Sequence, residues 1–234
     1  MSSSSATERG LRELSEEVVA CRRCPRLVDW RERAARERPR RYRDCSYWAR
    51  PLPGYGDPGA RVLVVGLAPA AHGGNRTGRI FTGDRSGDWL FAALHRAGLA
   101  NQATSVSLDD GLRLLDCYIA AIVRCAPPGN RPTPEERDAC LPYLVRELAL
   151  LPEVRALVCL GSFAWEGALR AMAERSHRVR PRSAFGHLAE APVGPYVLLG
   201  CYHPSQQNTF TGKLTEPMLD AVFRRARELA GLRS

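Results

Sequence analysis

Four short apolar runs alternate with helical patterns along the chain, and this alternation limits the possible folds more than any other feature. The runs are Arg61–Val65, Tyr118–Val123, Ala156–Leu160 and Tyr196–Leu199. Strands that alternate with helices form a largely parallel sheet that is covered by helices on both faces. The sequence therefore predicts an α/β protein, a three-layer α/β/α sandwich with a four-stranded, mainly parallel central sheet.

Short motifs predict where several helices begin. Thr133-Pro134-Glu135-Glu136 is a capping box with proline at the first helical position, and it predicts a helix that runs to about Leu150. Ser162 and Thr215 are candidate caps for two later helices. Residues 8–20 carry apolar side chains on one helical face and predict a helix near the N-terminus.

The basic charge of the chain favours a polyanionic partner. Lysine and arginine number 34 against 25 acidic residues, which gives a formal net charge of +9. Arginines are concentrated in residues 22–50, with Trp30, Tyr42, Tyr47 and Trp48 among them. We expect binding to nucleic acid that is largely electrostatic, independent of sequence and weakened by salt.

Nothing in the sequence points to a membrane. No apolar run is long enough to span a bilayer, and Met1 to Ala6 lack the pattern of a signal peptide. We therefore expect a cytoplasmic protein without a membrane partner. We also expect the protein to be a monomer.

Polar and glycine-rich segments follow three of the four predicted strands. These segments are Gly66–Asp84, Arg124–Thr133 and Cys201–Asn208. Ligands of open parallel sheets bind outside the carboxyl ends of the strands, so the three segments are expected to form one site. The first segment has neither the Walker lysine pattern nor G-x-G-x-x-G, which argues against a nucleotide hydrolase.

Four of the eight cysteines suggest a metal centre. Cys21 and Cys24 form a C-x2-C pair, while Cys125 and Cys140 are expected directly after a strand and on the following helix. A reducing cytosol argues against disulfides, and four thiolates suit either zinc or a [4Fe-4S] cluster. The spacing leaves both open. Cys45 is a rival fourth ligand, but it lies in the arginine-rich segment, where the chain is expected to be less rigid.

In this order, the motifs resemble those of the uracil-DNA glycosylase superfamily, most closely family 5, often called type B. The resemblance rests on Gly66–Gly73, Asn75–Asp84, His203-Pro204-Ser205 and the four cysteines, and it extends from about Cys21 to Leu229. It implies that Cys21, Cys24, Cys125 and Cys140 hold a [4Fe-4S] cluster. Residues 1–234 are then a single domain with a cluster-binding, arginine-rich N-terminal segment at about residues 8–60.

The chain departs from family 4 of the superfamily at two places. Leu67 stands where family 4 carries a glutamate, as in family 5. Ala120 and Ala121 occupy the strand that carries a uracil-reading asparagine in family 4. A pocket without that amide is expected to accept a wider range of bases.

The resemblance implies a DNA repair glycosylase. Such an enzyme flips uracil, hypoxanthine or xanthine out of double- or single-stranded DNA, hydrolyses the N-glycosidic bond and leaves an abasic site. The implied catalytic residues are Asp84 and His203, although Asp84 has the alternative role of capping a helix at Ser86–Asp88. The implied base pocket comprises Gly66, Leu67, Ala68, Phe81, Ala121 and Asn208, and the implied DNA contacts are Arg79, Ser205 and Gln206.

Two other classes of protein fit parts of the pattern. A non-enzymatic iron–sulfur protein that binds DNA would keep the cysteines and the basic charge, but it would need neither Asp84 nor His203. A zinc-stabilised nucleotide hydrolase would keep the cysteines with zinc in place of iron. Iron content and activity on uracil-containing DNA distinguish these classes.

Overall fold

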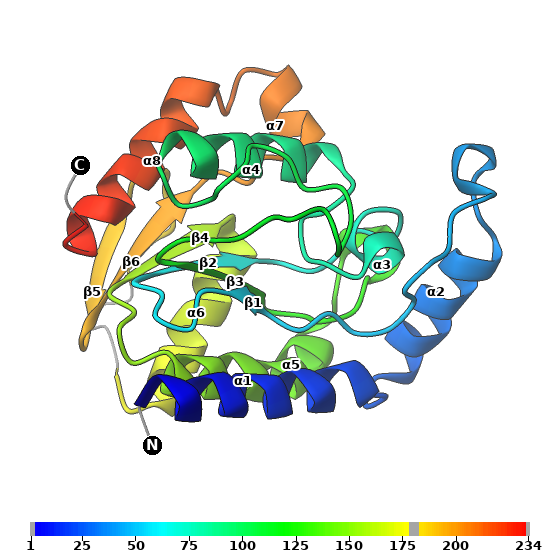
Figure 1. Ribbon diagram of the computed structural model, residues 1–234, viewed down its shortest axis with the longest axis horizontal. Helices are drawn as coiled ribbons and strands as arrows, with labels where there is room; N and C mark the ends of the chain where they lie inside the picture. The colour runs from blue at the N-terminus through cyan, green and yellow to red at the C-terminus, as the bar shows by residue number, and fades with distance from the viewer. Residues whose placement is uncertain (1–2, 178–182, 233–234) are drawn as a thin grey trace.

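The computed structural model describes residues 3–177 and 183–232, and a single mixed sheet lies at its centre (Figure 1). The strand order is β1-β3-β2-β4-β6-β5. The four central strands run parallel, while β1 and β5 are antiparallel edges. The strands are β1 Tyr55–Gly56, β2 Val62–Gly66, β3 Cys117–Ala121, β4 Ala156–Leu160, β5 Glu190–Val193 and β6 Tyr196–Cys201.

The predicted parallel core is confirmed, and the two edge strands are additions to it. β1 has only two residues and lies in a loop rich in proline and glycine. β5 contains Pro192 and alternates exposed and buried positions. The central strands β2, β3 and β4 are buried throughout, and β6 is buried at all but one position, so these strands appear in the sequence as continuous apolar runs, whereas the edge strands do not.

Helices cover both faces of the sheet and make the predicted three layers. In Figure 1, α4 and α8 lie on one face, and α1, α5 and α6 lie on the other. No helix in the described ranges is long and apolar enough to cross a membrane. The helices are α1 Ser3–Ala20, α2 Pro25–Arg36, α3 Gly74–Thr77, α4 Arg85–Arg96, α5 Pro134–Leu150, α6 Ser162–Glu174, α7 Gln206–Phe210 and α8 Glu216–Leu229.

The predicted helix starts are largely confirmed. The Thr133 hydroxyl accepts from the Glu136 amide at 3.2 Å, and the Glu136 carboxylate accepts from the Thr133 amide at 2.8 Å, so the capping box is formed. Thr215 caps α8. Ser162 is the first residue of α6 and not its cap, because Gly161 holds the N-cap position with φ of 93°. That left-handed conformation favours glycine.

Candidate active site and cysteine cluster

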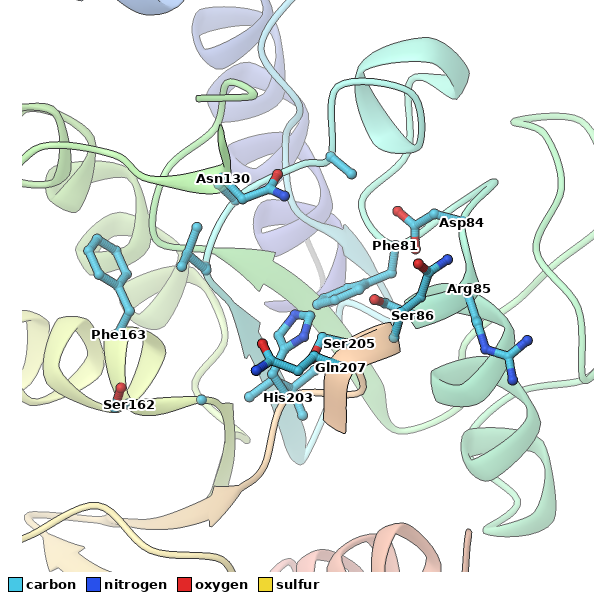
Figure 2. A pocket seen from close by; sticks show the side chains of 16 residues that line it. Phe81, Asp84, Arg85, Ser86, Asn130, Ser162, Phe163, His203, Ser205 and Gln207 are labelled. Atoms are coloured by element: carbon cyan, nitrogen blue, oxygen red, sulfur yellow. The ribbon is translucent and has the colours of Figure 1, made fainter. Parts of the chain in front are cut away.

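A cavity of about 530 Å³ opens at the carboxyl ends of the parallel strands. Its size is typical of sites for small molecules. Figure 2 shows Phe81 and His203 at its centre, with Asp84, Asn130 and Phe163 around them. Its walls come from the loops after β2, β3 and β6, as the order of the motifs predicted, and from the start of α6, which was not predicted. The lining residues are Leu67, Ala68, Ala70, Phe81, Asp84, Arg85, Ser86, Asn130, Leu160, Gly161, Ser162, Phe163, His203, Ser205, Gln206 and Gln207.

Phe81 is held in an unusual conformation beside His203. The two ring centroids are 6.0 Å apart, and the ring planes are inclined by 36°. Phe81 has φ of 58°, a left-handed conformation that is rare for a bulky residue and costs about 1–3 kcal/mol. A Cβ atom at Gly66 would lie 2.6 Å from Phe81 Cζ, and one at Gly87 would clash with the Phe81 carbonyl. The surrounding glycines therefore make room for this aromatic ring.

His203 is a neutral imidazole fixed by its own backbone. Burial lowers the pKa of His203 to about 4, so the ring carries one proton at neutral pH. Its carbonyl oxygen accepts from the Ser205 amide at 2.8 Å and from Asn208 Nδ2 at 2.8 Å. A neutral, oriented N–H is suited to donating to an oxygen on which negative charge develops.

Asp84 both caps a helix and lines the cavity. Its Oδ1 atom accepts from the Gly87 amide at 3.1 Å, which makes Asp84 the N-cap of α4. Its Oδ2 atom lies against Gly73, where an added Cβ would clash with it. Burial raises the pKa of Asp84, and the capping hydrogen bonds oppose that rise. The capping role expected as an alternative is therefore present, and it leaves the second oxygen of a more basic carboxylate at the cavity.

Gly66→Ala tests how closely the Phe81 ring must pack against the carboxyl end of β2. Because the added methyl would overlap the ring, we expect Phe81 to shift. The rate of the base excision that the sequence resemblance implies is then expected to fall by up to about 10²-fold, as small displacements of site residues do. Single-turnover kinetics on uracil-containing DNA measure this. Gly59→Ala, where the nearest atom would be 3.4 Å away, is the matched control. Equal rates for the two variants would show that the Phe81 position is not critical.

Three of the residues predicted for the base pocket do not line the cavity, namely Gly66, Ala121 and Asn208. Leu67 and Ala68 line the cavity, so their amides stay candidate donors. Gly66 receives the Phe81 ring instead of a ligand. Ala121 does not line the cavity, because it is fully buried in the apolar cluster that includes Phe81. Asn208 does not line it either, because its amide is used to hold the His203 backbone.

Arg79 is not available to DNA, contrary to the sequence prediction. Its side chain is only 7% exposed, and Nη2 contacts Asp110 Oδ2 at 2.6 Å. It also donates to Ser105 at 2.8 Å and to Thr82 at 3.1 Å. The guanidinium therefore ties the motif loop to the segment before β3. By contrast, Ser205 and Gln206 line the cavity, and Ser205 also caps α7.

Sequence reasoning missed part of the opposite wall. Asn130 lies at the end of a 3₁₀ turn, Pro128–Asn130, with φ of 56°. The segment containing it was recognised, but nothing singled out this residue. Ser162 and Phe163 were missed because β4 leads into α6 without a polar loop, so Ser162 read only as a cap. The other lining residues outside the predicted set are Ala70, Arg85, Ser86, Leu160, Gly161 and Gln207.

The four predicted cysteines gather beside α2. Cys21 follows α1, Cys24 is the N-cap of α2, Cys125 follows β3, and Cys140 lies in α5. The four thiols are close enough to affect one another: proximity to Cys21 raises the pKa of Cys24, Cys125 and Cys140, after the larger effect of burial. Arg31, only 2% exposed, donates from Nη1 to Cys125 Sγ at 3.0 Å. Segments distant in sequence thus bring four thiols to one place.

The donor set that these four cysteines offer consists of thiols alone. Within the described ranges, no three histidine, cysteine or acidic side chains are placed to hold one metal ion. A four-iron cube needs its thiolates farther apart than a single tetrahedral zinc does, with Zn–S bonds of about 2.3 Å. Burial raises the pKa of Cys125 to about 12 and that of Cys140 to about 11, so both are protonated when metal-free. The rival ligand Cys45 lies elsewhere, on the segment after α2, near Tyr47.

Comparison with known proteins decides the family of this fold and site. The model of the uracil DNA glycosylase superfamily matches residues 53–227, which contain all six strands and the whole cavity. The chain belongs to the uracil-DNA glycosylase superfamily. The predicted enzyme class, a DNA glycosylase, is confirmed.

The curated relatives place this glycosylase with the type-5 branch of the superfamily. A type-5 uracil-DNA glycosylase of Mycobacterium bovis is 57% identical over 222 residues, 94% of this chain and 82% of the relative. One from Thermus thermophilus is 52% identical over 216 residues, 92% of this chain and 96% of the relative. A type-4 enzyme of Pyrobaculum aerophilum is 30% identical over 199 residues, 83% of each chain. The resemblance to family 5 is thereby confirmed.

Proposed function

We propose that this glycosylase excises uracil and the deaminated purines hypoxanthine and xanthine from DNA by hydrolysis, leaving an abasic site. The observation that carries the proposal is the Phe81–His203 pair, 6.0 Å between centroids, beside the Asp84 carboxylate in a cavity of about 530 Å³. An aromatic face, a neutral donor and a carboxylate are the groups that base excision requires. The names of the type-5 relatives support uracil as a substrate.

The geometry assigns a role to each group. Cleavage of an N-glycosidic bond places positive charge on the sugar and negative charge on the leaving base. The base must leave the duplex stack to reach the cavity, where its ring stacks on Phe81. His203 donates its N–H to a base oxygen as charge develops there. Asp84 orients the attacking water or stabilises the sugar cation through the oxygen that the helix cap does not use.

The walls beside Phe81 and His203 favour a broad range of bases. These walls come from Leu67, Ala68, Leu160 and Gly161, and they offer backbone and apolar groups but no side-chain amide. A site that reads one base edge by buried polar groups rejects other bases strongly, whereas these four wall residues provide no polar side chain. Three side-chain amides also line the cavity, those of Asn130, Gln206 and Gln207, and Asn130 is exposed on the far wall. The proposed wide range of accepted bases therefore depends on the shape and chemistry of the cavity and not on Ala121.

Oligonucleotides of one sequence that carry uracil, hypoxanthine or xanthine test this range of substrates, each as a single strand, as a mismatched duplex and as a fully paired duplex. We expect the wild type to cleave all three, and single-stranded or mismatched substrates to react fastest because extrusion costs least there. Asn130→Ala is expected to leave the ranking of the three bases unchanged. Cleavage confined to uracil in the wild type, relaxed by Asn130→Ala, would show that Asn130 reads the base and that the cavity is selective.

A [4Fe-4S] cluster on Cys21, Cys24, Cys125 and Cys140 is part of the proposal. The support is the set of four thiols from distant segments, which the family resemblance matches to cluster ligands, and the charge of Arg31 beside Cys125. When bound, a cluster joins the α1–α2 segment to β3 and α5, which contributes to folding. Its proposed role is structural, because the cysteines are not among the residues that line the active-site cavity.

Cys140→Ser tests this centre, with Cys45→Ser as the matched control. We expect the purified protein to contain iron and little zinc, with Cys140→Ser losing most of the iron and part of its stability. Cys45→Ser is expected to keep the full iron content. Metal analysis and the visible absorption spectrum measure both. Stoichiometric zinc without iron would overturn the cluster, and iron loss in Cys45→Ser alone would reassign the fourth ligand.

A further inference from the structure

A second hollow adjoins the active-site cavity. Its volume is about 410 Å³, and it shares Ala70, Asp84, Asn130 and Gln206 with the first. Its outer wall comes from α2 and from the 3₁₀ turn Arg40–Tyr42, in the segment that follows α2 and extends at the right of Figure 1. The two hollows form one continuous groove, so a strand whose nucleotide enters the cavity passes along the second hollow.

Two arginines are ordered by one aromatic ring in this wall. The Cζ atom of Arg41 lies 4.8 Å from the Tyr42 ring centroid, and that of Arg76 lies 4.4 Å from the same centroid. Arg76 is further fixed by donation to the carbonyls of His72 at 2.9 Å and Gly83 at 3.0 Å. The Tyr47 hydroxyl forms a hydrogen bond of 2.9 Å with His72 Nδ1 and so connects the segment after α2 to the loop that holds Arg76. Stacking thus holds the guanidiniums in place before any ligand arrives.

The positive charge of this wall is not balanced locally. In the described part of the chain, the Arg41 guanidinium has neither a carboxylate nor a hydrogen-bond partner. Asp84 is the single carboxylate among the described residues that line either hollow. The charges of Arg41 and Arg76, after burial, lower the pKa of His72, as expected of two cations close to one ring. The buried indole N–H of Trp30, on the same wall, has no acceptor among the described residues.

We propose that Arg41, stacked on Tyr42, binds a backbone phosphate of the DNA strand next to the extruded nucleotide. This inference rests on the proposed function, because it assumes that the target strand enters the adjoining cavity. A phosphodiester supplies the negative charge and the acceptor oxygens that this wall lacks. Such a contact positions the strand without reading its sequence, which suits an enzyme that searches for damaged bases.

Arg41→Gln tests the site, with Arg40→Gln as the matched control. Arg40 is the preceding arginine on the same turn, and it does not line the hollow. On single-stranded uracil-containing DNA, we expect Arg41→Gln to lose about tenfold in affinity and to reduce the log–log salt slope by about 0.7, the value for one phosphate. Arg40→Gln is expected to change neither. Arg41→Lys is expected to recover part of the loss, because it keeps the charge but not the planar stack.

Neutral methylphosphonate linkages placed singly around the uracil locate the phosphate. The wild type is expected to lose affinity at one linkage near the uracil, and Arg41→Gln is expected to be insensitive at that linkage only. Two results would overturn the proposed contact while uracil excision by the wild type continues. One is an equal loss of affinity in Arg41→Gln and Arg40→Gln, and the other is an Arg41→Gln variant that keeps the wild-type sensitivity at every linkage. Absence of excision in the wild type would instead overturn the proposed function.

Discussion

His203→Ala lowers the single-turnover rate of uracil excision by about 10²–10³-fold, the loss typical of one well-placed donor to a developing oxyanion. The imidazole lies beside Phe81 and is neutral because burial lowers its pKa to about 4. The contribution of His203 is therefore expected to be constant from neutral pH down to about pH 5 and to change only as the ring gains a proton near pH 4. His95→Ala, at an exposed position of α4, is the control and is expected to keep the full rate.

The second catalytic candidate, Asp84, allows its two roles to be separated. Asparagine is as good an N-cap as aspartate, so Asp84→Asn removes the charge and keeps α4 capped. Asp84→Ala removes both. We expect similar large losses of rate in the two variants and a loss of stability of about 1 kcal/mol in Asp84→Ala alone. A near-wild-type rate in Asp84→Asn would leave this residue with its capping role only.

Glu147→Gln destabilises the fold by about 3–5 kcal/mol, the cost of leaving a buried charge without its partner. The Arg124 and Glu147 side chains are 1% and 2% exposed, and they form two hydrogen bonds of 2.9 Å and 2.5 Å between the end of β3 and α5. The amide keeps the size of the carboxylate but not its charge. Denaturant unfolding of variants with the same measured metal content gives the change.

Two further variants show whether the buried charge is the cause. Glu190→Gln breaks an exposed pair with Arg225 and is expected to cost far less stability than Glu147→Gln, because exposed ion pairs are screened by solvent. The double replacement Arg124→Met with Glu147→Leu is expected to recover most of the stability, because apolar pairs often replace buried ion pairs without loss. If Glu147→Gln and Glu190→Gln cost the same, the Arg124 charge is not isolated from solvent as the structure describes.

The central sheet could be predicted from the sequence because its strands are buried on both faces. Such strands appear as uninterrupted apolar runs, and the capping box marks α5 without any tertiary information. Edge strands carry no such pattern, so β1 and β5 could not be found. Parallel strands also predict where loops meet, which is why Phe81, Asp84 and His203 were expected at one site before the structure placed them there.

What the sequence could not predict depends on partners far along the chain. The sequence predicts Arg79 as a DNA contact, but in the structure its guanidinium is paired with Asp110. The sequence also predicts Asn208 in the base pocket, but its side-chain amide donates to the His203 carbonyl. Gly66 and Gly73 belong to the motif segment that was expected to form the site. They are needed because Phe81 and Asp84 occupy the space that a side chain would fill. In each case a local pattern indicates a special residue but not its partner.

The central claim is that the cavity at the strand ends hydrolyses the bond between a deaminated base and its sugar. The most direct test incubates the protein with a single-stranded oligonucleotide carrying one uracil and measures free uracil and strand length separately. Release of uracil in amounts equal to the abasic sites formed is predicted, with the strand intact until alkali is added and both products greatly reduced in His203→Ala. No released uracil, or a strand cut without free base, would contradict it.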